Sequence, residues 1–120
     1  MTEVTKSPFG TMPDGHALEL YTLRNARGTT VAVTTYGARL VSFTREVNGT
    51  SVDIVLGYRS GADYLRDTTS MGGVVGRHAN RIADGRVTIG GHTYQLEQNS
   101  GSRKQNHIHG GTHGLHYHLW

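Results

Sequence analysis

Two short segments of this 120-residue chain combine side chains that can bind a polar ligand and move protons. The first contains Asn80 and Arg81, which place an amide that donates and accepts hydrogen bonds beside a guanidinium with a rigid fork of donors. The second contains His109, and histidine is a residue type that suits acid–base chemistry near neutral pH. Two glycines follow His109, and a glycine pair lets the backbone turn sharply or approach a ligand closely. The pattern indicates a histidine held beside a cleft.

A plainer interpretation of the same residues is favoured on residue type alone. Asn80 and Arg81 are then loop side chains that satisfy backbone groups and solvent. His109 is then a strand histidine beside a glycine turn. Residue type by itself therefore does not establish a site.

The segment from His107 to His118 is rich in histidine and is a second candidate for chemistry. Alternating residues of a strand share a face, so His107 with His109, or His116 with His118, could bind Zn²⁺, Ni²⁺ or Cu²⁺. The chain has no cysteine, no carboxylate stands near these histidines in the sequence, and the spacing matches no closed structural zinc site. We therefore assign no metal ligand and keep a histidine-rich metal binder as an alternative.

The elements that must position these residues read as β-strands joined by glycine-rich turns. The chain has 17 glycines and only 2 prolines, which is typical of a turn-rich β protein. Asn48-Gly49 and Gly90-Gly91 predict two tight hairpins. Alternation and β-branched residues predict strands over 16–23, 30–36, 41–47, 51–56, 86–89 and 92–96.

The remaining segments are not clear strands. Residues 60–67 could form one short helical turn, and residues 98–104 read as a polar surface loop. Residues 71–75 are compatible with a buried strand or a close-packed loop. The chain ends on an apolar, strand-like run after Gly111.

The domain organisation follows from this pattern. Residues 1–15 are polar and contain Pro8, Pro13 and Asp14-Gly15, so we expect an irregular lead-in that ends in a turn. Residues 16–120 have the length of one small domain. Because the last predicted strand would lack an onward partner, we expect this domain to be incomplete. Unpaired strand edges and an exposed apolar face would then favour self-association.

Composition and charge argue against several classes of partner. The formal net charge is +3 with scattered Lys and Arg, whereas nucleic-acid-binding proteins concentrate basic residues in a patch, so we expect no nucleic-acid partner. No stretch approaches the roughly 18 consecutive apolar residues of a membrane-spanning helix, so we expect no membrane association. The first residues lack the apolar core of a secretory signal, and the absence of cysteine agrees with a cytoplasmic location.

Several motifs of the chain, taken in order, resemble those of aldose 1-epimerases (galactose mutarotases). A match of many separate motifs in one order is far more specific than a single short pattern. The matching residues are Pro13-Asp14-Gly15, 21–25 (YTLRN), Tyr36-Gly37-Ala38, 55–58 (VLGY), 76–82 (GRHANRI), Tyr94-Gln95-Leu96, Asn99, 106–111 (NHIHGG), 114–116 (GLH) and Trp120.

This resemblance implies a fold, an activity and a site. The fold would be all-β, an antiparallel β-sandwich of the galactose mutarotase type, of which this chain is the N-terminal portion. The activity would be interconversion of the α and β anomers of hexoses such as glucose and galactose, without a cofactor. Asn80, Arg81 and His109 would line the sugar pocket, with His109 also in a catalytic role.

The activity needs an acid and a base, and the chain offers only part of that pair. Mutarotation takes a proton from the C1 hydroxyl and gives one to the ring oxygen, so two groups must act together. The histidine and glutamate that act as acid and base in the family match no position here, and each of the 9 acidic residues has a plain surface interpretation. A non-catalytic or vestigial carbohydrate-binding protein is therefore an alternative to the enzyme.

Overall fold

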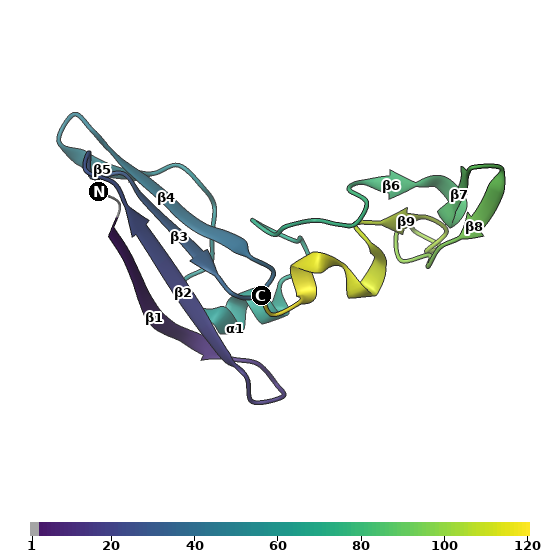
Figure 1. The fold of residues 1–120 in the computed structure, drawn as a ribbon, viewed down its shortest axis with the longest axis horizontal. Helices are drawn as coiled ribbons and strands as arrows, with labels where there is room; N and C mark the ends of the chain where they lie inside the picture. The colour runs from purple at the N-terminus through teal and green to yellow at the C-terminus, as the bar shows by residue number, and fades with distance from the viewer. Residues whose placement is uncertain (1–2) are drawn as a thin grey trace. The chain divides into compact units, whose positions relative to one another are not determined.

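The computed structural model describes residues 3–120, which form two compact units (Figure 1). The first unit extends to Val74 and includes Leu119–Trp120, and the second unit is Val75–His118. The sequence predicted a single domain from residue 16 onward, and the division into two units is a difference from that expectation.

An antiparallel sheet dominates the first unit. Its five strands pair in sequence order, β1-β2-β3-β4-β5, each antiparallel to the next. In this meander, each strand pairs with the strand that follows it in the sequence. The strands are β1 (Glu3–Thr11), β2 (Ala17–Arg24), β3 (Thr30–Thr34), β4 (Arg39–Val47) and β5 (Thr50–Asp53).

The predicted Asn48-Gly49 hairpin is confirmed. Both residues have positive φ, 51° at Asn48 and 76° at Gly49, as a type I′ turn requires. The turn pairs Val47 with Thr50 and so fixes the register of β4 against β5. The return strand ends at Asp53, earlier than the sequence pattern predicted.

The expectation of an irregular lead-in over residues 1–15 is wrong for residues 3–11, while residues 1–2 lie outside the described part of the chain. Residues Glu3–Thr11 form β1 and pair with β2 along their length, with a register shift between Pro8 and Gly10. Proline cannot donate to a ladder, but β1 lies at an edge of the sheet, where proline is tolerated. The turn at Pro13 and Asp14-Gly15 follows as predicted, with the Gly15 N–H donating to the Met12 carbonyl.

The predicted helical turn is confirmed as α1 (Gly61–Arg66). Ser60 caps its first turn, because its Oγ accepts from the Asp63 N–H at 3.3 Å. Tyr64 is fully buried, with its ring centroid 6.0 Å from that of Phe9 of β1, and Leu18 of β2 is also fully buried. A Cβ at Gly61 would meet the Phe9 carbonyl at 2.7 Å, so this approach of helix to sheet needs glycine.

The surface interpretation of Asp67 is wrong, because Asp67 is buried in an ion pair with Arg39. Arg39 Nη1 donates to Asp67 Oδ2 at 2.6 Å, and both side chains have 0% exposure. Asp67 also accepts from Thr69 and Met71, so the buried carboxylate is well satisfied. Burial raises the pKa of Asp67, but the hydrogen bonds from Thr69, Arg39 and Met71 outweigh it and hold the pKa well below its ordinary value.

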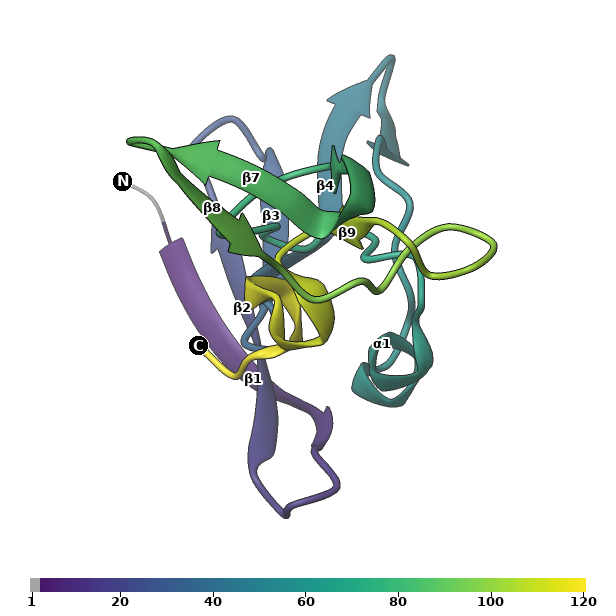
Figure 2. The same cartoon turned by 90° about the vertical axis from the view of Figure 1, so that its right-hand side faces the viewer.

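The second unit consists of short strands and tight turns. The predicted Gly90-Gly91 hairpin is confirmed, with φ of 58° and 80° at the two glycines (Figure 2). A separate two-stranded ladder joins β6 to β9 across an intervening segment of the chain. The elements are β6 (Arg81–Ile82), the 3₁₀ helix η1 (Ala83–Gly85), β7 (Arg86–Ile89), β8 (His92–Gln95), β9 (His107–Ile108), and the 3₁₀ helices η2 (Gly111–His113) and η3 (Leu115–Tyr117).

The predicted strand-like run after Gly111 is mostly wrong. Residues 111–117 form η2 and η3, in which the Gly114 N–H donates to Gly111 and the Tyr117 N–H donates to Gly114. Gly110 and Gly111 have positive φ, 84° and 81°, which lets the chain turn here instead of extending. Only the last two residues behave as a strand, since Leu119 pairs with Tyr36 and the Trp120 N–H donates to the Thr35 carbonyl.

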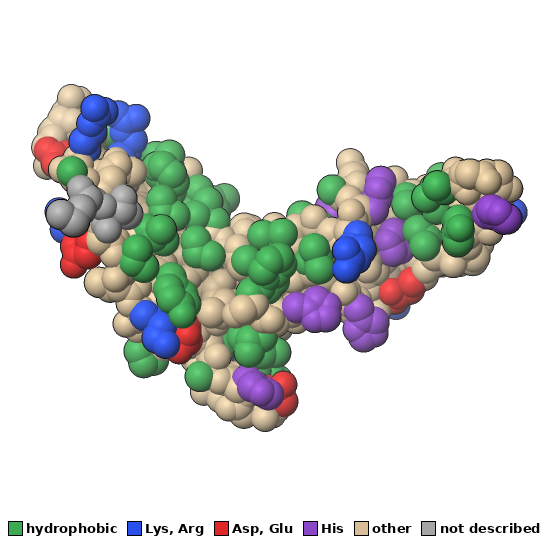
Figure 3. Space-filling model, in the orientation of Figure 1, with side chains coloured by type: hydrophobic (Ala, Val, Ile, Leu, Met, Phe, Trp, Pro, Cys, Tyr) green, Lys and Arg blue, Asp and Glu red, His purple; other side chains and the backbone are tan. Residues whose placement is uncertain are grey.

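The first unit exposes apolar side chains over its sheet. The face drawn in Figure 3 shows hydrophobic side chains gathered over the strands. The large exposed ones of β2, β4 and β5 are Tyr21, Leu23, Val47 and Val52. Self-association through such a surface stays a prediction. Among residues 3–120, no helix has the length and apolar character needed to cross a membrane.

Candidate functional site

Asn80 and His109 are directly bonded, although 29 residues separate them. The Asn80 backbone N–H donates to Nδ1 of the His109 ring at 3.1 Å, and the His109 backbone N–H donates to the Asn80 carbonyl at 3.3 Å. The pair stands at the end of the β6–β9 ladder, one step beyond the pairing of Arg81 with Ile108. The structure therefore brings Asn80, Arg81 and His109 to one end of one ladder.

The backbone at this end has an uncommon conformation. Asn80 has a φ of 65° and His109 a φ of 55°, in the left-handed region that side-chain-bearing residues rarely adopt. Asparagine and histidine tolerate it better than most, and such residues cluster at functional sites. Gly110 follows with a φ of 84°, and a Cβ there would collide with the Gly76 carbonyl oxygen. The glycine after His109 is thus required by the close approach of Gly76.

Arg81 presents its guanidinium to solvent. It lies on β6 with an exposed side chain, and its Cα pairs with that of Ile108. Within residues 3–120, its guanidinium takes part in no ion pair or side-chain hydrogen bond found in the structure. Its donors are therefore open to a ligand.

Two side chains from the loop after β8 hold the segment that carries His109. The side-chain amide of Asn99 makes two hydrogen bonds with the backbone of Ile108. Its Oδ1 accepts from the Ile108 N–H at 2.8 Å, and its Nδ2 donates to the Ile108 carbonyl at 3.2 Å. Glu97 accepts from the N–H and from the hydroxyl of Thr112, each at 2.8 Å. The segment is thus fixed immediately before His109 and three residues after it.

Glu97 was missed as a site-supporting residue by the sequence reading, which placed it on the surface. Its carboxylate is exposed, but the backbone and hydroxyl hydrogen bonds from Thr112 lower the pKa of Glu97 below its ordinary value. A Cβ at Gly111 would collide with Oε2 of Glu97, so this glycine is also required. No local pattern signals the contact, because Glu97 and Thr112 lie 15 residues apart.

A second histidine lies beside His109. The His116 side chain is buried, and its ring centroid lies 6.4 Å from that of His109 in an edge-to-face arrangement. Gly114 permits this packing, since a Cβ there would collide with the His109 carbonyl. His116 therefore packs against the site residue from within the same unit.

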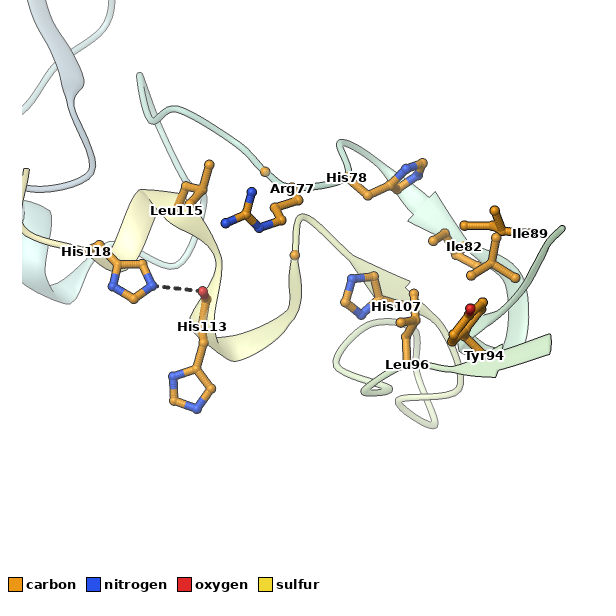
Figure 4. Close-up of a pocket in the computed structure, with 13 residues that line it drawn as sticks. Arg77, His78, Ile82, Ile89, Tyr94, Leu96, His107, His113, Leu115 and His118 are labelled. Carbon is orange, nitrogen blue, oxygen red and sulfur yellow. Dashed lines mark hydrogen bonds between the residues drawn. The ribbon is translucent and has the colours of Figure 1, made fainter. Parts of the chain in front are cut away.

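A cavity of the second unit is not formed by the three predicted residues. It has a volume of about 620 Å³, and neither Asn80, Arg81 nor His109 lines it. Its wall is mainly apolar, and Figure 4 shows His107, Leu96 and Tyr94 on one part of it and Leu115 on another. The labelled lining residues are Arg77, His78, Ile82, Ile89, Tyr94, Leu96, His107, His113, Leu115 and His118.

The histidines of this segment do not assemble into a metal site. Across the part of the chain that the structure describes, residues 3–120, no group of three or more His, Cys, Asp or Glu side chains could hold a metal ion. His107 Nδ1 instead lies 2.8 Å from the Glu97 carbonyl oxygen, and His118 Nε2 lies 3.0 Å from the His113 carbonyl oxygen (Figure 4). The metal-binder alternative therefore finds no support in the structure.

No carboxylate that the structure describes, from residue 3 to residue 120, is hydrogen-bonded to Asn80, Arg81 or the His109 ring. Glu97, the acid that supports the segment, directs both its oxygens to Thr112. An amide, a guanidinium and an imidazole are thus brought together on an antiparallel β framework, and a binding site formed by them stays a prediction.

Comparison with known proteins identifies the family. The sequence model described as aldose 1-epimerase matches residues 19–120. The chain belongs to the aldose 1-epimerase family, which confirms the resemblance drawn from its motifs.

Individual relatives and solved structures agree with this assignment. The galactose mutarotase of Mus musculus is 38% identical over 122 residues, covering 100% of this chain and 34% of that protein. The aldose 1-epimerase of Escherichia coli (strain K12) is 37% identical over 109 residues, covering 90% of this chain and 31% of that protein. The crystal structure of galactose 1-epimerase from Lactobacillus acidophilus NCFM superposes with a TM-score of 0.81 at 32% identity, covering 100% of this chain and 33% of that chain.

The fold class predicted from the sequence is confirmed by these structural neighbours. Strands are mostly antiparallel and helices are few and short, as in galactose epimerase and mutarotase folds. The chain spans about a third of the length of the relatives it matches.

Proposed function

We propose that this chain supplies the hexose-binding wall of an aldose 1-epimerase site, formed by Asn80, Arg81 and His109. The observation that carries the proposal is the reciprocal hydrogen bonding of Asn80 and His109 beside Arg81. It supports the proposal because three residues with complementary polar side chains meet at one end of the β6–β9 ladder. The proposed ligand is a free hexose such as galactose or glucose, in keeping with the names of the relatives.

The chemistry of these groups suits a polyhydroxylated ring. The Arg81 guanidinium can donate to two neighbouring hydroxyl oxygens at once, and the Asn80 amide can both donate and accept. The His109 imidazole supplies a further polar contact on the same wall. No cofactor is needed, because ring opening and closing only moves protons between the C1 hydroxyl and the ring oxygen.

A complete reaction needs a proton acceptor that these three residues do not supply. The relatives are about three times as long as this chain, so we propose that the acid and base come from residues outside these 120. In that arrangement His109 contributes to binding and orientation. A cytoplasmic location remains our expectation from the cysteine-free sequence.

The binding part of the proposal is tested by titrating ¹⁵N-labelled chain with D-galactose. We expect saturable shifts at the amides of Asn80, Arg81 and His109 at millimolar sugar, lost in Arg81→Ala. Arg86→Ala, which alters an exposed arginine of β7, serves as the control and should bind normally. If saturating sugar perturbs no amide of the β6–β9 ladder, the binding proposal is wrong.

A non-catalytic carbohydrate-binding protein is the second candidate. The observation that favours it is the lack of a carboxylate at the candidate site among residues 3–120. Polarimetry of freshly dissolved α-D-galactose separates the two candidates. Saturable binding with anomerisation at the buffer rate supports the binding protein, whereas a rate that rises with protein concentration and falls in His109→Gln supports the enzyme.

A further inference from the structure

We propose that the backbone of Asn80 holds neutral His109 in the tautomer that carries its proton on Nε2, so that the ring meets a sugar only as a hydrogen-bond donor. The sugar as recipient rests on the proposed function, whereas the tautomer rests on geometry alone. The inference removes His109 from the acid–base role that its residue type suggested and makes it a residue that orients the ligand.

The hydrogen bond from Asn80 fixes the tautomer. A backbone N–H can only donate, so Nδ1 of His109, 3.1 Å away, must offer a lone pair. A neutral imidazole has one N–H and one bare nitrogen, and the proton must therefore sit on Nε2. The opposite tautomer would set two donors face to face.

The surrounding contacts keep the ring in this position. The second Asn80–His109 bond, between the His109 N–H and the Asn80 carbonyl, ties the two backbones together. Asn99 holds Ile108 on one side of His109, and Glu97 holds Thr112 on the other. The ring cannot turn to expose Nδ1 without breaking the bond to Asn80.

The fixed tautomer sets what the site can recognise. An Nε2–H needs an acceptor oxygen, and the Arg81 guanidinium likewise only donates. Because the His109 Nε2–H and the Arg81 guanidinium both donate, they favour ligand oxygens that can accept a hydrogen bond and disfavour ligand groups that can only donate one. The wall thus orients the sugar and leaves proton removal to a group outside it.

The test is a long-range ¹H–¹⁵N correlation spectrum of the imidazole rings in ¹⁵N-histidine-labelled chain, at a pH where the rings are neutral. His109 is assigned by its loss in His109→Gln. We expect the Nε2–H form of His109 to exceed the other by about tenfold or more, because the alternative leaves the Asn80 N–H unpaired. His92, an exposed histidine of strand β8, serves as the comparison for a less constrained histidine.

Variants separate the backbone contact from the Asn80 side chain. Asn80→Gly retains the N–H and tolerates a φ of 65°, so we expect the Nε2–H form to persist while galactose binding weakens. Asn99→Ala removes both bonds to Ile108, and we expect the two tautomers of His109 to approach each other in population.

The outcomes distinguish this inference from the proposed function. An Nδ1–H form, or an even mixture, in the unaltered chain overturns the tautomer inference whether or not sugar binds. A dominant Nε2–H form in a chain that binds no sugar supports the tautomer and overturns the proposed function.

Discussion

Arg39 and Asp67 form a fully buried ion pair, with Nη1 of Arg39 2.6 Å from Oδ2 of Asp67 and neither side chain exposed. Their positions are 28 residues apart, on strand β4 and just after helix α1. The Arg39 guanidinium also donates to the Met71 carbonyl at 3.3 Å, so the pair joins the sheet to the loop that follows the helix. The pair thus connects three segments of the first unit.

Replacing Asp67 with Asn should destabilise the protein strongly. It leaves the Arg39 charge buried without its partner, which costs about 3–5 kcal/mol in comparable pairs. Chemical denaturation measures the loss. The control is Asp63→Asn, which breaks an exposed pair with Arg66 and should change stability little. Similar midpoints for the two variants would contradict the prediction.

The same carboxyl group predicts a dependence of stability on pH. Because the folded-state pKa of Asp67 is depressed, its contribution is fully present above the unfolded-state pKa of about 3.9 and is lost as the pH falls further, towards the folded-state value. Unfolding curves at pH 7 and pH 3 should therefore differ less in Asp67→Asn than in the unaltered chain. An equal decrease in both proteins would show that other groups carry the acid sensitivity.

Gly111→Ala should destabilise the second unit more than Gly91→Ala does, although the two glycines have the same backbone conformation. Gly111 and Gly91 have φ of 81° and 80°, but only at Gly111 would a Cβ collide with Glu97, while Gly91 has open space around it. The shared backbone penalty is about 1–2 kcal/mol, and we expect an additional loss in Gly111→Ala. Denaturation of the two variants measures the difference. Equal losses would mean that the contact between Glu97 and Thr112 adapts freely.

Replacing Arg81 with Lys should weaken hexose binding although the charge is kept. Lysine offers a compact point charge instead of a planar fork, so one of two simultaneous hydrogen bonds to sugar hydroxyls is lost. The expected effect is roughly a tenfold rise in Kd for galactose, from the loss of one hydrogen bond involving a charged group. The exposed position of Arg81 predicts an unchanged midpoint of unfolding. Full affinity in Arg81→Lys would show that charge alone is recognised.

Local sequence was enough to predict the tight turns of both units. Asn48-Gly49 and Gly90-Gly91 adopt the positive φ that only such residues accept readily, and each turn sets the register of its hairpin. The helical turn predicted over residues 60–67 forms as Gly61–Arg66, and the structure shows that its cap, from Ser60 to Asp63, is also local in the sequence. These features depend on neighbours in the sequence.

The motifs also predicted the family and pointed to Asn80, Arg81 and His109, but not how these residues meet. That His109 accepts a hydrogen bond from the Asn80 backbone through Nδ1 is decided by the β6–β9 pairing. The support from Glu97 and Asn99 is likewise a contact across a loop.

By itself, the sequence determined the strand-and-turn character of this chain and the residue types at its candidate site. Only the tertiary structure decided that residues 3–11 form an edge strand, that Arg39 and Asp67 are buried together, and that Nδ1 of His109 accepts a hydrogen bond from the Asn80 N–H. The physical reason is the range of the interactions. A turn is stabilised within a few adjacent residues, whereas burial and the direction of a hydrogen bond depend on segments that become neighbours only when the chain folds.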